Sequence, residues 1–462
     1  MTALWTSQDM EAATLGAVSK PFAVTGLSID TRTIKPGDLF VALKGDARDG
    51  HQFVKDALAA KAGAALVQRA VADVPANAPL LTVANTQRGL EDLARASRAR
   101  THAQIIAVTG SAGKTTTKEM LRLAFGALGR THASAASYNN HWGVPLSLAA
   151  MPQNTAYGIF EVGMNHFGEL RALVGQVRPH VALVTTIAPA HLEFFETCDA
   201  IADAKSEIFE GIVSGGSALI PADSPYAARL RGRARQAHVS RILNFGSGAE
   251  CEARLVGLEE TDEGVKVLSR ILGRDVHFRL GAPGAHNASN AVAALLAVAA
   301  VDGDVLNAAA ALSNFNALKG RGERFDLKIA GKHVRLIDES YNANPSSMAA
   351  ALGNLGTAQA KRRIAVLGDM LELGPGSASL HANLAGAVED ARVDLVFLSG
   401  SAMAALWEKI PASRRGAYGA KSADIADALV DVLQDGDAVL VKGSFGSKMA
   451  VIVEALKTRA GD

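Results

Sequence analysis

The chain is poor in cysteine, in aromatic residues and in net charge. Its 462 residues include two cysteines, Cys198 and Cys251, which lie far apart and form no CxxC pair. This spacing excludes a disulfide framework and a cysteine-built zinc site, and it is typical of proteins in a reducing compartment. The formal net charge is +1, so no overall field attracts nucleic acid or an acidic membrane surface.

Long hydrophobic runs are also missing. The longest apolar run extends from Ala291 to Val301, whereas a membrane-spanning helix needs about 20 residues. Asp9 and Glu11 stand where a signal peptide would need its apolar core. We therefore expect a soluble, cytoplasmic and monomeric protein with no nucleic-acid partner. Hydrophobic residues make up 48% of the chain, as in a globular protein with a large core.

Apolar runs separated by helical stretches predict an α/β fold. A continuous apolar run at 105–108 is typical of a strand that is covered on both faces. Similar runs with helical stretches between them predict doubly wound parallel sheets in the middle and at the end of the chain. These runs lie at 158–162, 181–187, 217–220, 364–368, 395–399 and 438–443. Shorter runs and turn signals predict antiparallel strands over 241–281 and a hairpin over 325–338.

These patterns predict three domains, with limits at 1–102, 103–321 and 322–462. The fold class that we expect is α/β throughout. It comprises a mixed α/β domain at the N-terminus, a central parallel α/β domain with a phosphate loop, and a Rossmann-like α/β domain at the C-terminus. A chain of 462 residues is long enough for about three domains.

The run TGSAGKTT has the residue types of a phosphate-binding loop. A strand, a Gly-rich loop and a helix start form a nest of backbone N–H groups that binds phosphate. Lys114 supplies a charge for the outer phosphates, and the Thr115 hydroxyl can bind Mg²⁺. The alternative is a structural glycine turn, because Val108 replaces the usual first glycine, but a turn leaves Lys114 and the following threonines unexplained. The residues expected to contact the nucleotide here are Thr109, Gly110, Ser111, Ala112, Gly113, Lys114, Thr115 and Thr116.

Three further polar residues follow predicted strands or lie on a predicted helix nearby. Glu161 ends an apolar strand, and a buried carboxylate is costly unless a cation lies close to it. It is therefore a candidate metal ligand, with a salt-bridged structural glutamate as the alternative. His191 comes at the same edge of the sheet and is either a second metal ligand or a structural histidine. From the sequence alone, Lys205 is an ordinary surface lysine.

Over nearly its whole length the chain resembles the Mur ligases of bacterial peptidoglycan synthesis. The resemblance rests on TGSAGKTT and on the blocks EVGMNHFGEL, APAHLE, AKSEIF, GAHNASNAVAA, GRGER, DESYNANPSSM and LGDMLELG. It implies ATP-dependent formation of an amide bond through an acyl phosphate. The last two blocks resemble the family member whose substrates are UDP-N-acetylmuramoyl-tripeptide and D-alanyl-D-alanine.

The resemblance also implies cofactors and catalytic residues. ATP would be held by Lys114, and two Mg²⁺ ions would be bound, the first by Thr115 and Glu161 and the second by His191. Lys205 would be carbamylated and would help to hold the second ion, which reverses its interpretation as a surface lysine. Burial would provide the neutral amine that this modification needs, by lowering the pKa of the side chain. Arg321 would reach the γ-phosphate only when the domains close.

Further residues are carried over from the family to the nucleotide and to the UDP-sugar. Without the resemblance, Asn290 would be a polar residue on a helix surface. The block at residues 26–53, GLSIDTRTIKPGDLFVALKGDARDGHQF, would be a strand with a Pro-Gly turn. Lys442 either faces the incoming dipeptide or is structural. The nucleotide contacts implied are Asn287, Asn290, Arg321, Asp338 and Asn342, with His286, Tyr341 and Asn344 beside them. The UDP-muramoyl contacts implied are Ser28, Thr31, Arg32, Gly45, Asp49, His51, Asn139 and Asn140.

Other classes of nucleotide-binding protein fit the sequence less well. A switch GTPase would be expected to carry an N-K-x-D block, which is absent from the sequence. A simple kinase or ATPase would not need the second α/β unit after residue 322. Folylpolyglutamate synthase, another amide ligase, would not be expected to carry YNANP together with GDMLELG.

Overall fold

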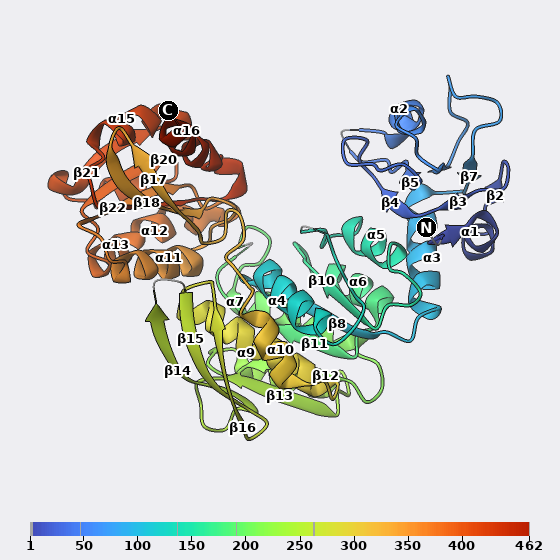
Figure 1. The fold of residues 1–462 in the computed structure, drawn as a ribbon, viewed down its shortest axis with the longest axis horizontal. Coiled ribbons are helices and arrows are strands. Elements are labelled where there is room, and N and C mark those ends of the chain that lie inside the picture. Colours follow the sequence, from blue (N-terminus) through green and yellow to red (C-terminus); the bar gives the residue numbers. More distant parts are fainter. Residues whose placement is uncertain (1–2, 47, 136, 191, 262–263, 462) are drawn as a thin grey trace.

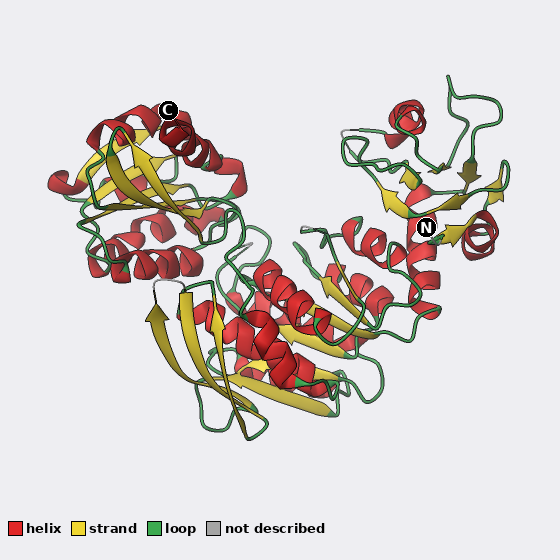
Figure 2. Ribbon diagram, viewed as in Figure 1, coloured by secondary structure: helices red, strands yellow, loops and turns green. Residues whose placement is uncertain are grey.

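The computed structural model describes residues 3–46, 48–135, 137–190, 192–261 and 264–461. Three lobes follow one another along the chain: an N-terminal lobe with strands β1–β7, a central lobe with β8–β16 and a C-terminal lobe with β17–β22. The two outer lobes stand apart on either side of the central lobe (Figure 1). Each lobe combines helices and strands (Figure 2). In the described part of the chain, no helix has the length and apolar character needed to cross a membrane.

The N-terminal lobe is built on a small mixed sheet with strand order β2-β7-β6-β5-β4. β2 is antiparallel to β7, and the other neighbours are parallel. The strands are β2 (Ala17–Val18), β4 (Gly26–Ser28), β5 (Asp38–Val41), β6 (Ala64–Val67) and β7 (Leu80–Thr82), and β1 (Trp5–Thr6) pairs with β3 (Ala23–Val24). The helices are α1 (Ser7–Thr14), α2 (Val54–Ala59) and α3 (Thr86–Ala99), and α3 packs against α5 of the central lobe.

The central lobe contains a nine-stranded sheet with the order β16-β15-β14-β13-β12-β11-β8-β10-β9. Its strands are β8 (Gln104–Thr109), β9 (Thr131–Ala133), β10 (Tyr157–Glu161), β11 (Val181–Val184), β12 (Ser217–Pro221), β13 (Arg241–Gly246), β14 (Ala253–Thr261), β15 (Gly264–Ile271) and β16 (Arg274–Leu280). Its helices are α4 (Lys114–Gly126), α5 (Gly143–Ala149), α6 (Glu169–Val177), α7 (Cys198–Ser206), α8 (Ala227–Gln236), α9 (Ala285–Ala300) and α10 (Val305–Leu312).

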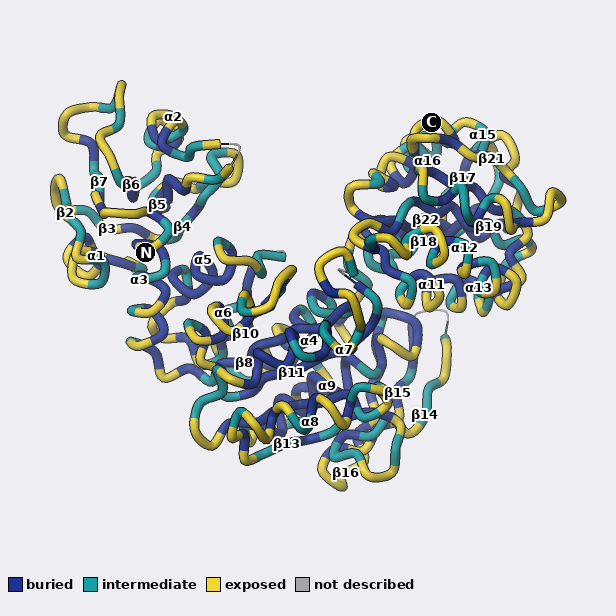
Figure 3. Tube along the Cα trace, turned by 180° about the vertical axis from the view of Figure 1, so that it is seen from behind, coloured by how far each residue is buried: buried dark blue, intermediate teal, exposed yellow. Residues whose placement is uncertain are grey.

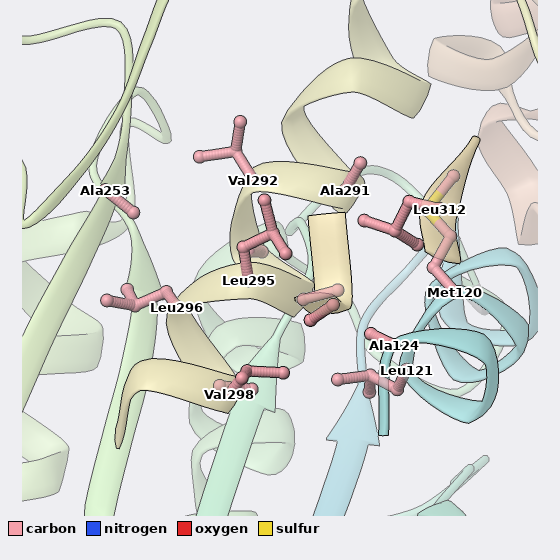
Figure 4. Packing of buried hydrophobic residues seen from close by; sticks show 14 of the residues in the cluster. Met120, Leu121, Ala124, Ala253, Ala291, Val292, Leu295, Leu296, Val298 and Leu312 are labelled. Atoms are coloured by element: carbon pink, nitrogen blue, oxygen red, sulfur yellow. The ribbon is translucent and has the colours of Figure 1, made fainter. Parts of the chain in front are cut away.

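Alternate residues of β8 enter different hydrophobic cores, as expected for a strand covered on both faces. Ile106 and Val108 pack with α4, α9 and α10 on one face. Ile105 and Ala107 pack with α5–α8 on the other face. Figure 4 shows the first core, where the apolar side chains of α9 lie against those of α4. This packing fixes the strand and the helix that flank the phosphate loop.

The C-terminal lobe contains a six-stranded sheet with the order β17-β18-β22-β19-β20-β21. β17 is antiparallel to β18, and all other neighbours are parallel. The strands are β17 (Glu323–Ile329), β18 (Lys332–Glu339), β19 (Arg362–Gly368), β20 (Leu395–Ser399), β21 (Arg415–Gly419) and β22 (Asp437–Lys442). The helices are α11 (Pro345–Thr357), α12 (Ser377–Ala382), α13 (Leu384–Asp390), α14 (Ala404–Trp407), α15 (Ala426–Val432) and α16 (Ala450–Gly461).

The predicted fold class is confirmed, and one expectation about strand direction is wrong. β13 lies inside the stretch 241–281 that we expected to be antiparallel, yet it is parallel to both β12 and β14. The antiparallel part begins only with the β14–β15 and β15–β16 pairs. β13 follows helix α8 and returns to the sheet by a helical crossover, which joins parallel strands. The domain limits at 102 and 321 stay predictions.

The sheets bring the carboxyl ends of several strands to one place. Figure 3 shows the buried strands at the centre of each lobe, with more exposed loops around them. Ligands of open α/β sheets bind outside the carboxyl ends of the strands. In the central lobe these ends carry Thr109, Glu161 and Val184, and in the C-terminal lobe β18 and β22 end at Glu339 and Lys442.

Candidate functional site

The loop between β8 and α4 requires glycine at two positions. Gly110 has φ +151° and Gly113 has φ +80°, in the region that side chains with a Cβ rarely adopt. A Cβ on Gly110 would lie 1.9 Å from Oγ1 of Thr185, and a Cβ on Gly113 would lie 2.9 Å from Nδ2 of Asn290. The backbone of the loop therefore lies too close to Thr185 and Asn290 for a side chain at either glycine.

Two hydroxyl groups hold this loop against the end of β11. Thr185 Oγ1 donates to the Ala112 carbonyl oxygen at 2.6 Å. Ser111 Oγ donates to the Ala188 carbonyl oxygen at 2.9 Å and accepts from the Ala188 N–H at 3.0 Å. Thr185 was not among the residues predicted from the sequence, although a polar pair at the end of an apolar strand, Thr185–Thr186, was a signal for it.

Positive charges gather around the loop. Lys114 Nζ donates to the Gly110 carbonyl oxygen at 2.7 Å. Burial lowers the pKa of Lys114, the charge of Glu161 raises it in part, and the charge of Arg321 lowers it further. Lys205 on α7 is 1% exposed, so it is not an ordinary surface lysine. Burial and the charge of Lys114 hold the pKa of Lys205 well below its usual value.

The buried carboxylate Glu161 is held by two donors. Thr115 Oγ1 donates to Glu161 Oε2 at 2.8 Å, and Asn139 Nδ2 donates to Glu161 Oε1 at 2.7 Å. Ser137 Oγ lies 3.3 Å from Thr115 Oγ1. Mg²⁺ prefers oxygen ligands, so this group of carboxylate and hydroxyl oxygens fits a magnesium ion. In the described ranges no three His, Cys, Asp or Glu side chains form a metal-binding group, and His191 lies outside the described residues.

A cleft of about 380 Å³ extends from the loop into the C-terminal lobe. Asn344 Nδ2, at the start of α11, crosses the cleft and donates to the Ser111 carbonyl oxygen at 3.4 Å. The lining residues that the sequence had suggested are Ser111, Ala112, Gly113, Thr116, His286, Asn287, Asn290, Arg321, Asn342, Asn344 and Lys442. The cleft therefore brings together residues from the central and C-terminal blocks.

Several of these residues have partners within the cleft wall. Asn287 Nδ2 donates to the Pro283 carbonyl oxygen at 2.7 Å. Lys442 Nζ forms an ion pair with Glu339 at 3.1 Å and donates to the Asn342 carbonyl oxygen at 3.0 Å. His286, in the first turn of α9, is exposed and also lines the cleft. Lys442 is thus buried in the cleft wall and paired with Glu339 and Asn342, and its contact with an incoming dipeptide stays a prediction.

Asp338 lies behind this wall. Its carboxylate is 1% exposed and accepts from the Gly320 N–H at 3.2 Å, the Ser340 N–H at 3.0 Å and the Ser340 hydroxyl at 2.6 Å. These bonds hold the junction between the central and C-terminal lobes. Its neighbour Glu339 lines the cleft, so the contact of Asp338 with a ribose stays a prediction.

The expected sugar-binding residues of the N-terminal lobe form local interactions. Ser28 Oγ donates to the Asp30 carbonyl oxygen at 2.9 Å, and Arg32 pairs with the Asp30 carboxylate at 2.5 Å. The hydrogen bonds of Asp49 to His51 and Arg69 hold the pKa of Asp49 well below its usual range, against the effect of burial. Thr31 is half-buried in the loop between β4 and β5.

The His51 ring is less available than the sequence suggested. Its Nδ1 lies 2.6 Å from Asp49 Oδ1, and its Nε2 accepts from the Gln68 N–H at 3.0 Å. Gly45 lies close to Trp142, since a Cβ there would lie 2.8 Å from the indole ring. This contact joins the N-terminal lobe to the loop before α5.

The two neighbouring asparagines of SYNN have different positions. Asn139 holds Glu161, as described above, whereas Asn140 Oδ1 accepts from the N–H groups of Trp142 at 3.2 Å and Gly143 at 2.9 Å. Asn140 therefore supports the start of α5. The structure places Asn139 beside the predicted metal ligands, and the contact of either residue with a UDP-sugar stays a prediction.

Three models of one protein family match successive parts of the chain. They are the Mur ligase family catalytic domain at residues 23–103, the Mur ligase middle domain at 108–298 and the Mur ligase glutamate ligase domain at 320–445. Among curated relatives is the UDP-N-acetylmuramoyl-tripeptide–D-alanyl-D-alanine ligase of Rickettsia prowazekii, which is 31% identical over 98% of this chain and 99% of that protein. The enzyme of the same name from Escherichia coli is 34% identical, and the match covers 93% of each chain.

Comparison of the fold with solved structures indicates the same family. A crystal structure of MurF from Acinetobacter baumannii superimposes with a TM-score of 0.86 and 30% identity, and the match covers 98% of this chain and 99% of that one. Sequence, fold and the order of the three domain models therefore agree, and the chain belongs to the Mur ligase family.

Proposed function

We propose that this chain catalyses the ATP-dependent addition of D-alanyl-D-alanine to UDP-N-acetylmuramoyl-tripeptide in peptidoglycan synthesis. The observation that carries the proposal is the cleft between the phosphate loop and the C-terminal lobe. It combines a nest for phosphates with polar residues from the C-terminal sheet. The relatives named for this reaction match nearly the whole chain, so each lobe has a counterpart in them.

The reaction needs an activated carboxylate, because a free carboxylate is a poor acyl donor. A terminal oxygen of the tripeptide attacks the γ-phosphorus of ATP, which gives an acyl phosphate and releases ADP. The amine of the dipeptide then attacks the acyl carbon and displaces inorganic phosphate. Catalysis of such steps is mainly a matter of positioning and of charge stabilisation.

The cationic residues of the cleft fit this chemistry. Lys114 lies at the start of α4, where its charge and the helix dipole both favour phosphate oxygens. Arg321 lies in the segment that joins the central and C-terminal lobes, where its guanidinium stacks on the Tyr341 ring, and it is close enough to Lys114 to lower its pKa. Closure of the lobes would bring Arg321 to the γ-phosphate.

Thr115 and Glu161 are the residues that would hold a Mg²⁺ ion. A bound ion would neutralise negative charge on the phosphate groups of ATP. Asn139 fixes the orientation of Glu161 by its hydrogen bond of 2.7 Å, so the carboxylate is in place before a cation arrives. A second ion held by His191 and Lys205 belongs to the same proposal.

The environment of Lys205 supports its carbamylation. A neutral amine can attack carbon dioxide to form a carbamate with loss of one proton. Burial and the nearby charge of Lys114 favour the neutral amine. The product is an anion. The charge of Lys114, which disfavours the ammonium form of Lys205, would stabilise this anion.

The proposal is tested by measuring ADP release with each substrate omitted in turn. Release that requires both UDP-N-acetylmuramoyl-tripeptide and D-alanyl-D-alanine supports it, whereas turnover with folate and glutamate would replace it by the activity of a folylpolyglutamate synthase. Lys114→Met should abolish release. Lys361→Met is the matched control, because Lys361 pairs with Asp435 on the surface of the C-terminal lobe. Tripeptides that end in diaminopimelate or lysine, assayed side by side, identify the third residue.

A further inference from the structure

A series of hydroxyl groups joins the C-terminal lobe to the predicted metal ligands. Tyr341 follows β18, and its hydroxyl donates to Ser137 Oγ at 3.1 Å across the gap between the lobes. Ser137 Oγ lies 3.3 Å from Thr115 Oγ1, which in turn donates to Glu161 at 2.8 Å. A residue of the C-terminal lobe is thus connected to the phosphate loop through one side chain of the SYNN segment.

The ring of Tyr341 is held in place by its own side of the cleft. The guanidinium of Arg321 lies 4.1 Å from the ring centroid, a cation–π geometry. The ring of Phe445 lies 5.8 Å away at an angle of 50°. Gly320 has φ +71°, and a Cβ there would come within 3.0 Å of Tyr341 Cβ. Because these contacts restrain the ring, the position of its hydroxyl follows the position of the C-terminal lobe.

Ser137 can accept the hydroxyl proton of Thr115 when a cation binds. The single proton of the Thr115 hydroxyl is donated to Glu161, the same carboxylate that would bind the cation. If both oxygens turn to a cation, that proton needs another acceptor. Ser137 Oγ is within 3.3 Å, and a hydroxyl oxygen has two lone pairs. It can therefore accept from Thr115 and from Tyr341 at the same time.

We propose that Ser137 and Tyr341 are positioning residues that couple docking of the C-terminal lobe to cation binding at Thr115 and Glu161. The inference rests on the proposed function for the identity of the nucleotide and the cation. The alternative is a surface contact without influence on the cation. The two alternatives can be distinguished, because coupling requires that the Tyr341 and Ser137 hydroxyl groups affect cation binding together.

The test measures the Mg²⁺ concentration needed for half-maximal binding of a non-hydrolysable ATP analogue. Tyr341→Phe keeps the ring and its stacking but removes the donor. Tyr418→Phe is the matched control, because the Tyr418 hydroxyl donates to the Gly400 carbonyl oxygen within the C-terminal lobe. We expect Tyr341→Phe and Ser137→Ala each to raise the Mg²⁺ midpoint about threefold to tenfold, the effect of one hydrogen bond. Tyr418→Phe should leave it within about twofold.

The double variant decides between coupling and separate effects. If the residues act as one unit, the double variant should show no larger shift than the larger single variant. Independent shifts that multiply in the double variant would overturn the proposal, as would a midpoint for Tyr341→Phe equal to that of Tyr418→Phe. Neither result depends on the ligase reaction, because the assay stops at nucleotide binding.

Hydrogen exchange provides a readout that needs no ligand. In the free protein, Tyr341→Phe should speed amide exchange in the segment 137–142, whereas Tyr418→Phe should not. Equal exchange in the two variants would show that the contact is not formed in solution and would refute the proposal. If the wild-type protein bound no ATP analogue at all, the proposed function would fail, and the exchange comparison would still test the contact.

Discussion

A methyl group at Gly110 is predicted to disable the phosphate loop. In Gly110→Ala the new Cβ would lie 1.9 Å from Thr185 Oγ1, whereas real Cβ contacts essentially never fall below 3.0 Å. The atoms must therefore separate by roughly 1 Å, and Thr185 would lose its hydrogen bond to the Ala112 carbonyl oxygen. The positive φ adds strain, so we expect a cost of about 2–4 kcal/mol. A displacement of roughly 1 Å at a reacting site costs about 100-fold in rate.

The assay combines binding of an ATP analogue, measured by calorimetry, with ADP release. Gly126→Ala is the matched control on the same helix, because no atom lies within 4 Å of a Cβ placed there. Gly126 is exposed in the last turn of α4, where alanine favours the helix by about 0.5–1 kcal/mol. Gly126→Ala should therefore bind and turn over ATP normally.

Removal of the Thr185 hydroxyl should partly restore nucleotide binding to Gly110→Ala. Thr185→Ala removes the oxygen at 1.9 Å, and the next nearest atoms to the new Cβ, Thr185 Cβ and the Thr186 nitrogen, lie at 3.1 Å. Thr185→Ala combined with Gly110→Ala should therefore bind the analogue more tightly than Gly110→Ala alone. Wild-type affinity in Gly110→Ala would refute the argument, since it would mean that the loop tolerates a Cβ at this position.

Substitutions of Lys205 and of the two asparagines of SYNN should have distinct effects. Lys205→Ala should lose activity that short carboxylic acids partly restore in steady-state assays, and a fully active variant would exclude the carbamate. Asn139→Ala should lower kcat/KM about tenfold or more by freeing Glu161, whereas Asn140→Ala should lower the melting temperature, because its bonds support α5.

Local patterns made the central features of the site predictable from the sequence. The phosphate loop depends on residues that adjoin one another, so TGSAGKTT was sufficient to place it between a strand and a helix. The place of Glu161 at the end of a buried strand was predictable because a lone carboxylate ends an apolar run, while its role as a metal ligand stays a prediction. The strands β8, β10, β11 and β12 were predictable for a similar reason, since burial on both faces produces continuous apolar runs.

Features that depend on distant partners were not predictable in this way. The roles of Ser137 and Thr185 follow from groups that are far away in the sequence, in the C-terminal lobe and in the loop after β8. β9 and β21 lie at sheet edges, where polar or small residues replace the apolar run that identifies a buried strand. The parallel direction of β13 was missed because the sequence shows where strands lie more clearly than how they pair.

The proposed carbamylation of Lys205 would change how the site receives cations. As ammonium ions, Lys205 and Lys114 would repel each other, with Glu161 as the nearby carboxylate that favours the charge of Lys114. Such a site would hold phosphate oxygens but would oppose a second cation. As a carbamate, Lys205 would attract Lys114 and offer oxygen ligands of the kind that Mg²⁺ prefers. If Lys205 is carbamylated as proposed, its burial, which lowers its pKa, is the property that would allow the site to accept cations together with a triphosphate.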